Sequence, residues 1–221
     1  MESPVLIYAE LLSQPCRSVV AFCEYSNIPY ELKVINLLAG EHETEEFIKM
    51  NPFKEIPTLA HGDFYLNESA AIVMYLADAF NVDNEWYPKD IKLRARVNAY
   101  LHAHHKFTRE PCRDYFFYCL VAPKYFAYPE PSESERARLK DNYEKYFSTL
   151  DWALEETGFI ARTPYMTIAD VFAYSEIVQT EVFNINWEAH PRAKKWFETV
   201  SLNPVVQQVH APIRAVIAKG I

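Results

Sequence analysis

The hydrophobic pattern changes along the chain, from short apolar runs in the first third to helical periodicity afterwards. Val5–Ala9 is a continuous apolar run that predicts a buried strand, and Tyr30–Ile35 is a second run rich in β-forming residues. Between them, Ser13 suits an N-cap and Pro15 suits the first turn of a helix that continues over Cys16–Tyr25. The chain therefore opens strand–helix–strand, which implies a parallel pair with a right-handed crossover.

A hairpin and a second amphipathic helix are predicted between Met50 and Phe80. Pro57–Ala60 and Phe64–Leu66 are short apolar runs, and Gly62-Asp63 between them is a dipeptide of the type that closes tight hairpins. Asn67 is the expected N-cap of the following helix. Its apolar positions recur at helical spacing: Ala71, Ile72, Tyr75, Leu76 and Phe80. With a short helix over about 44–50, the order becomes βαβαββα, that of an α/β thioredoxin-like domain over residues 1–80.

The pattern beyond residue 89 is helical, so we expect a linker at 81–89 and an all-α domain over 90–221. Pro111 lies inside a long helical region, 90–122, and must break or kink it. A loop is expected at 123–131. Ser132-x-x-Glu135 and Thr167-x-x-Asp170 are capping boxes, which predict helix starts at these positions. Further helices are expected at 191–200 and 204–219.

Composition narrows the function classes. The net charge of −8 argues against nucleic acid or an anionic membrane as the main partner. No apolar run approaches the roughly 18 residues that span a bilayer, and MESPVLIYAE lacks the pattern of a secretory signal. The four cysteines form no C-x-x-C, so a reducing, cytoplasmic compartment is the simplest interpretation. Four glycines are too few for a glycine-loop nucleotide site.

The start of the helix after Asn67 is a candidate ligand site. Backbone amides near Glu68 and Ser69 would be free, with the positive end of the helix dipole behind them, and this suits a carboxylate. The Glu68 carboxylate suits an ammonium, so the pair fits an α-amino acid group. Ile56-Pro57 allows a cis bond, which would turn a backbone edge toward a peptide-like ligand.

These motifs resemble the glutathione-binding half of the cytosolic glutathione transferases, through IPTL, a short hairpin and ESxAIxxYL. The theta class is the most similar in detail, in LLSQPCRSV, AGEHxxxEF, NPFKEIPTL, GDFYLNESAAI and WYPKDIKLRARV. Thr167-Ile-Ala-Asp170 matches the buried capping motif of the family. The resemblance covers essentially the whole chain. It implies conjugation of the glutathione thiolate to small electrophiles, with hydroperoxide reduction as a second reaction and glutathione as co-substrate.

The resemblance assigns roles to several residues. Ser13 corresponds to the catalytic serine, whose hydroxyl would stabilise the thiolate, although it also suits a plain N-cap. Gln14 is adjacent. Glu68 and Ser69 would hold the γ-glutamyl end, and the backbone at Ile56-Pro57 would pair with the cysteinyl unit.

Other residues are expected at the glycine end of glutathione and at the electrophile. His42 matches a position near the glycine carboxylate, but a solvated loop histidine fits equally. Glu55 departs from the family pattern, in which this position is usually basic. A carboxylate there would repel the glycine carboxylate unless the side chain turns away and Lys54 substitutes. The electrophile pocket is expected to use Arg109, Tyr115, Phe116 and Phe117, although an aromatic run also suits a core. No metal site is expected at His102, His104 and His105.

Two other functions remain open. Ser13-Gln-Pro-Cys16 places a thiol at the second position of a thioredoxin-like motif, which suggests a glutathione-dependent thiol–disulfide oxidoreductase. A non-catalytic binding or structural protein could use the same fold. The resemblance also implies a homodimer, built from the Glu68–Phe80 helix region of one subunit and the Asp90–His105 helix of the other. Arg94 and Arg96 could pair with acidic residues across this interface, or equally with surface residues of their own subunit. The resemblance implies a more open pocket too, because the chain stops at Ile221 without the extension that covers the site in mammalian theta enzymes.

Overall fold

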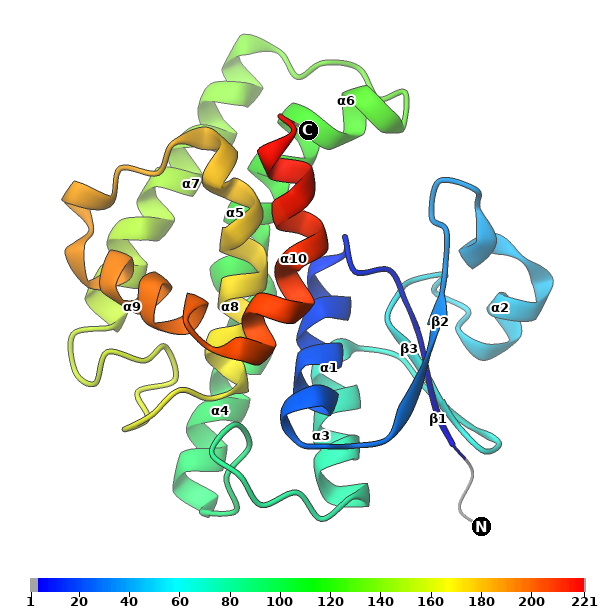
Figure 1. Cartoon of the computed structure of the whole chain (residues 1–221). Helices are drawn as coiled ribbons and strands as arrows, with labels where there is room; N and C mark the ends of the chain where they lie inside the picture. The colour runs from blue at the N-terminus through cyan, green and yellow to red at the C-terminus, as the bar shows by residue number, and fades with distance from the viewer. Residues whose placement is uncertain (1–3, 221) are drawn as a thin grey trace.

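The computed structural model describes residues 4–220 and places a four-stranded sheet beside a bundle of helices (Figure 1). The strands are β1 (Val5–Ala9), β2 (Tyr30–Val34), β3 (Thr58–His61) and β4 (Phe64–Leu66). Their order in the sheet is β2-β1-β3-β4. β2 runs parallel to β1 with Tyr30 opposite Val5, whereas β3 is antiparallel to β1. The predicted parallel pair, hairpin and βαβαββα order are confirmed.

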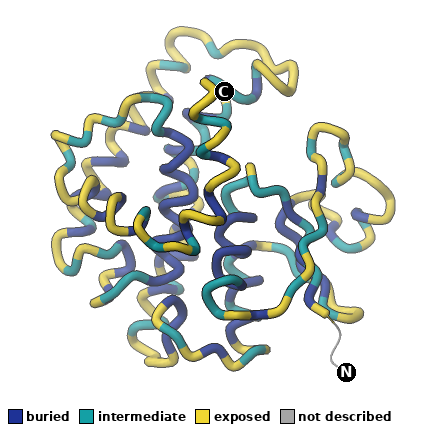
Figure 2. Tube along the Cα trace, viewed as in Figure 1, coloured by how far each residue is buried: buried dark blue, intermediate teal, exposed yellow. Residues whose placement is uncertain are grey.

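The sheet is covered by α1 (Gln14–Tyr25) and α3 (Ser69–Ala79) on the side of the helical bundle, and α2 (Glu45–Met50) lies on the other side (Figure 1). α1 contacts α8 (Ile168–Ile177) and α10 (Pro204–Ala218). α1 and α8 form the most continuously buried part of the molecule (Figure 2). Burial of both helices joins the sheet to the bundle, and it places the N-terminus of α1 near the boundary between them.

The start of α3 differs from the sequence-based expectation. Glu68, not Asn67, occupies the cap position, with φ 67° and ψ 108° and no side-chain capping hydrogen bond. The prediction of Asn67 as N-cap is therefore wrong by one residue. The reason is that the amide of Ile72 donates to the carbonyl of Glu68 at 2.9 Å, so the first helical carbonyl belongs to Glu68.

The long helical region around Pro111 continues with a change of register. It consists of α4 (Ile91–His104), a π-helical segment (His105–Arg109), α5 (Glu110–Phe116), a second π-helical segment (Phe117–Val121) and α6 (Ala122–Tyr125). Proline has no N–H and cannot complete an α-helical bond to the fourth residue before it. The first π-helical segment ends at Arg109, two residues before Pro111. The helix therefore accommodates the proline with a wider turn and continues beyond it. α6 also extends two residues past Pro123, into the expected loop.

The helix after Ser132 and α8 both begin where the capping boxes predict. The helices not yet given are α7 (Glu133–Ala153) and α9 (Pro191–Ser201), with 3-10 turns at Glu41–Glu43, Val178–Phe183 and Trp187–Ala189. The carboxylate of Glu135 accepts a hydrogen bond from the amide of Ser132 at 2.9 Å. Asp170 does the same for Thr167 at 2.8 Å. None of the described helices is both long enough and apolar enough to cross a bilayer.

Candidate functional site

A cleft of about 460 Å³ lies between the sheet side of the molecule and the α4–α5 helical run. Most of the residues singled out in the sequence line it: Ser13, His42, Glu55, Ile56, Pro57, Glu68, Ser69 and Arg109. These residues come from five segments that are far apart along the chain. Their convergence makes this cleft the candidate functional site.

Ser13 stands at the N-terminus of α1, on the wall of the cleft. Its backbone is extended, with φ −82° and ψ 130°, and its carbonyl accepts from the amide of Arg17 at 3.2 Å. The hydroxyl makes no capping hydrogen bond with the helix. A hydroxyl donor and the positive end of a helix dipole therefore meet at one point, which is suited to stabilise a thiolate. Gln14, the next residue, lies outside the described lining of the cleft.

Cys16 lies one turn further along α1 and is fully buried. Burial raises the pKa of its thiol to about 11, against smaller lowering effects that include hydrogen bonds with Glu10 and Ser13. A thiol with this pKa is protonated at neutral pH, and only the thiolate is a good nucleophile. Cys16 therefore has the character of a packed core residue.

The loop before β3 is fixed by one buried side chain. The Asn51 amide donates to the carbonyl of Glu55 at 2.8 Å and to the hydroxyl of Thr58 at 2.9 Å. The Ile56-Pro57 bond within this loop is cis, an isomer that the sequence allowed without deciding. Both residues are buried against the cleft. The Asn51 hydrogen bonds thus hold the backbone edge at Ile56 in place.

The start of α3 offers two complementary groups at the cleft. The Glu68 carboxylate is exposed and lies 3.6 Å from His105 Nε2. The first hydrogen bond within the helix is donated by the amide of Ile72. The amides of Ser69 to Ala71 therefore have no acceptor within the helix. An acceptor for an ammonium and donors for a carboxylate are therefore neighbours, as expected, although the cap residue differs.

The far end of the cleft carries mixed charge. Lys54 and Glu55 are both exposed at its rim, so a cation stands next to the carboxylate that departs from the family pattern. His42 also lines the cleft, and its Nδ1 atom is buried without a hydrogen-bond partner among the described residues. This end can offer donors to an anionic group.

The opposite wall is cationic and comes from the α4–α5 run. His104, His105, Arg109 and Arg113 line the cleft from this side. Arg109 Nη1 donates to Glu176 Oε1 at 2.5 Å, and 28% of the Arg109 side chain is exposed. Burial opposes ionisation of Glu176, but the charge of Arg109 and the nearby His104 outweigh it, so the pKa of this carboxyl is lowered. Glu176 was not among the residues expected from the sequence, because a lone acid in an apolar helix gives no sign of a partner 67 positions away.

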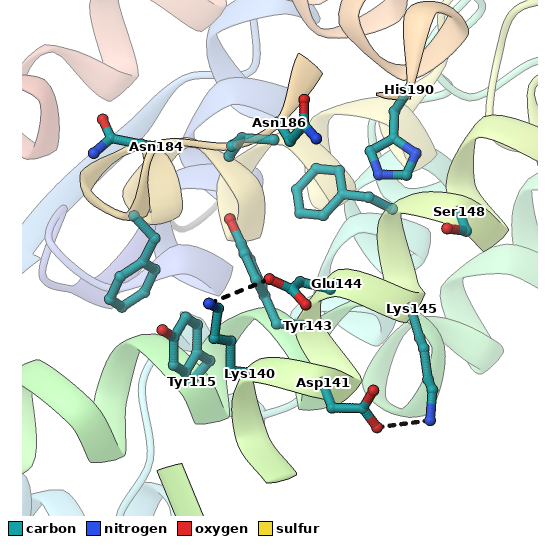
Figure 3. Close-up of a pocket in the computed structure, with 13 residues that line it drawn as sticks. Tyr115, Lys140, Asp141, Tyr143, Glu144, Lys145, Ser148, Asn184, Asn186 and His190 are labelled. Carbon is teal, nitrogen blue, oxygen red and sulfur yellow. Dashed lines mark hydrogen bonds and ion pairs between the residues drawn. The ribbon is translucent and has the colours of Figure 1, made fainter. Parts of the chain in front are cut away.

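The aromatic residues proposed for the electrophile pocket do not line this cleft. The Tyr115 ring packs 4.1 Å from that of Phe183, between centroids, and lines a different cleft of about 490 Å³ beside α7 (Figure 3). Phe116 is buried, and Phe117 lies under the guanidinium of Arg113 at 4.4 Å. Ion pairs one turn apart, Lys140–Glu144 and Lys145–Asp141, border the second cleft, as on an ordinary solvated helix face. Within residues 4–220, no group of three or more His, Cys, Asp or Glu side chains could hold a metal ion.

Comparison with known proteins places these features in context. Residues 6–78 match the family model "Glutathione S-transferase, N-terminal domain", and residues 111–204 match "Glutathione S-transferase, C-terminal domain". Mouse and human glutathione S-transferase theta-1 are each 33% identical over 199 residues, which cover 88% of this chain and 81% of either relative.

Solved structures agree with the sequence matches. Human glutathione transferase theta-2 in complex with glutathione and an unknown ligand superposes with a TM-score of 0.86 at 29% identity, over 97% of this chain and 89% of that chain. The human theta-class enzyme with the glutathione conjugate of 1-menaphthyl sulfate gives a TM-score of 0.87 at 29% identity, over 98% and 89%. The similarity thus spans both the sheet and the helical bundle.

Proposed function

The chain belongs to the glutathione S-transferase family, and from this premise we propose that the cleft at Ser13 joins the glutathione thiolate to small electrophiles. One observation carries the assignment to this cleft: the Ser13 hydroxyl makes no capping bond and stands at a helix N-terminus, in the same cleft as Glu68 and Ser69. A free thiol has a pKa of about 8.5, so only a few per cent is ionised at pH 7. A donor that stabilises the thiolate therefore raises the concentration of the nucleophile.

The test is direct binding followed by turnover. The protein is titrated with glutathione by calorimetry, and the complex is then assayed against an alkyl halide, an aryl halide and a hydroperoxide. We expect saturable binding and conjugation of at least one halide. Binding without turnover of any member of the panel would favour the non-catalytic alternative. No binding at all would overturn the assignment of this cleft.

We place glutathione with its γ-glutamyl end at α3. Its ammonium contacts Glu68, its carboxylate contacts Ser69 and the free amides, and its cysteinyl unit pairs with the backbone at Ile56-Pro57. The glycine carboxylate then lies toward His42 and Lys54. This orientation is supported by the groups that line the cleft: Glu68 supplies an acceptor for the ammonium, and Lys54 and His42 supply donors for the glycine carboxylate, next to Glu55. The sulfur reaches Ser13, with Gln14 adjacent, and the electrophile occupies the space beside Arg109.

Glu68→Gln should weaken glutathione binding, because the ammonium loses a charged acceptor. The carboxylate is 58% exposed, so solvent screening reduces the loss to about 1 kcal/mol, or roughly fivefold in Kd. Glu55→Lys should strengthen binding, since it replaces a repulsive group near the glycine end. Calorimetric Kd values report both, with Glu46→Gln, an exposed acid of α2 outside the cleft, as the control. Unchanged Kd for both cleft variants would exclude this orientation.

We also propose that the protein forms a homodimer, in which α3 of one subunit packs against α4 of the other. We further propose that it acts in the cytoplasm, in detoxification. Apolar side chains are exposed near this proposed interface: Phe64 is 42% exposed, Tyr65 46% and Ile91 79%. The earlier expectation for the arginines changes, because Arg94 pairs with Asp78 and Arg96 with Glu156 within one chain. Apolar contact, not these charges, then carries the interface.

Sedimentation equilibrium at micromolar concentration should give about twice the mass of the 25.8 kDa chain. Tyr65→Glu should shift the mass toward one chain, because it places a charge on the apolar surface. A mass of one chain for the unaltered protein would contradict the proposed assembly.

A further inference from the structure

Glu176 is a buried carboxylate directly behind the cationic wall of the cleft. It belongs to α8, and its side chain is 1% exposed. Arg109 Nη1 donates to its Oε1 atom at 2.5 Å, and His104 Nε2 lies 3.7 Å from the same atom. Arg109 and His104 both line the cleft, whereas Glu176 does not. One hidden acid therefore contacts two groups that face the ligand space.

The π-helical segment between these two residues makes the shared contact possible. His104 and Arg109 are five positions apart, and at 3.6 residues per turn an α-helix would point them about 140° apart. A π-helical turn closes over five residues, so the two side chains point to the same side. Thr108 anchors the segment on its buried side, where the Tyr100 hydroxyl lies 2.8 Å from the Thr108 hydroxyl. The change of helix register thus directs Arg109 and His104 at Glu176.

Arg109 is the cation on which the buried charge depends. The other nearby cation, Arg17, is fully buried but donates to the carbonyls of Leu11, Leu12 and Ser175. Glu176 Oε2 has no hydrogen-bond partner among the described residues. A buried carboxylate that loses its partner is strongly unfavourable, so the pair resists separation. A guanidinium has five N–H donors, and the exposed part of Arg109 leaves some of them on the cleft side.

We propose that Glu176 is a positioning residue, which fixes the Arg109 guanidinium as a preformed donor to the departing group of the electrophile. This inference rests on the proposed transferase function. As the thiolate sulfur bonds to carbon, the bond from carbon to the leaving group breaks, and its electron pair departs with that group as an anion. Donors that are fixed before the reaction stabilise such charge without reorganisation. The substrate class is electrophiles that release a small anion, such as a halide.

The test compares Glu176→Gln with the unaltered enzyme on benzyl chloride, bromide and iodide. Gln has the same shape but no charge, so Arg109 loses its anchor. We expect kcat/KM to fall about tenfold on the chloride and clearly less on the iodide, because a poorer leaving group depends more on the donor. The Kd of glutathione should change by less than about twofold, since Arg109 lies on the electrophile side. An equal loss on all three halides, or no loss, would overturn the positioning role.

A second set of variants separates positioning from folding. Arg109→Met or Glu176→Met alone should lower the thermal midpoint, and the double variant should recover it while the chloride rate stays low. In the Arg109→Met background, Glu176→Met should cause no further loss of rate. Further loss there would mean that Glu176 acts by another route. Glu181→Gln is the matched control, because its carboxylate pairs with Arg214 at 3.4 Å outside the cleft, and its halide pattern should match the unaltered enzyme.

The two levels of the proposal fail in different ways. If the unaltered enzyme turns over none of the halides or other electrophiles, the transferase assignment fails and the positioning role with it. If the unaltered enzyme is active but Glu176→Gln keeps the same ratio of rates across the halides, only the positioning role is rejected.

Discussion

Replacing Ser13 with alanine is expected to lower kcat by about 10²–10³-fold, the usual effect of losing one donor to a charged reacting group. The hydroxyl stands at the N-terminus of α1 and lines the cleft, so its removal leaves the sulfur of bound glutathione without that donor. The pKa of the bound thiol should rise, and each unit corresponds to about 1.4 kcal/mol. Thiolate absorbance against pH, with and without the substitution, measures the shift directly.

Stability should change little in this variant. Ser13 makes no side-chain capping bond, so the loss of about 1 kcal/mol that follows the removal of a typical cap is not expected. Ser132 provides the matched control, because its hydroxyl accepts from the amide of Glu135 at 3.3 Å in an exposed capping box. Ser132→Ala should therefore lose about 1 kcal/mol of stability and keep full turnover. Full activity of Ser13→Ala on every substrate, with unchanged thiolate absorbance, would remove Ser13 from the mechanism.

Cys16→Ser distinguishes the transferase from the thiol–disulfide oxidoreductase. Cys16 is buried, and its raised pKa keeps it protonated at neutral pH, so we expect conjugation to survive the substitution. An oxidoreductase would show the reverse order, with disulfide reduction abolished in Cys16→Ser and little effect of Ser13→Ala. Each variant is assayed with an alkyl halide and with a mixed disulfide, so that the order of the two variants is measured for both reactions.

Much of the fold was predictable because its signals are local. The helix starts at Ser132 and Thr167 follow from side chains within three residues of each cap. The hairpin follows from Gly62, whose φ of 66° is open to glycine at little cost. The start of α3 was misplaced since Asn67 has the better capping propensity, yet the backbone bond from Ile72 selects Glu68. The capping propensity of Asn67 was therefore outweighed by the backbone conformation that joins β4 to α3.

The site was predictable only in part, because local motifs identify some of its residues but do not determine which side chains of a long helical run face the cleft. Ser13, Glu68 and Ser69 lie in motifs whose resemblance to a family could be recognised, and the structure brings them into one cleft. The π segments are not encoded in any periodicity that the sequence shows, and they decide which residues of the 91–125 run face the cleft. They turn Arg109 toward it and leave Tyr115 against Phe183. Side-chain direction in that run therefore had to come from the structure.

Asp170 is expected to be the residue whose loss most destabilises the fold. It is fully buried in α8, where its Oδ1 accepts from the amide of Ile160 at 2.9 Å and from Trp196 Nε1 at 2.8 Å. Its Oδ2 accepts from the amide of Thr167 at 2.8 Å. Burial raises the pKa of the carboxyl, against the opposing effect of these hydrogen bonds. One side chain thus holds the start of α8, the preceding loop and α9 together.

Asp170→Ala would leave three buried N–H groups without an acceptor, in addition to the Thr167 hydroxyl, which donates to Oδ2 at 3.3 Å. Each unpaired N–H is unfavourable by about 1–3 kcal/mol. The expected loss is therefore about 3–9 kcal/mol, a large part of the roughly 5–15 kcal/mol that stabilises a domain. Urea denaturation measures it, with Glu135→Ala as the matched change in the exposed capping box of α7, where solvent can replace the lost bond and about 1 kcal/mol is expected. Similar losses in the two variants would mean that the bonds to Ile160 and Trp196 add nothing beyond a cap. A much larger loss at Asp170 identifies burial of the donors, not the capping motif itself, as the source of the effect.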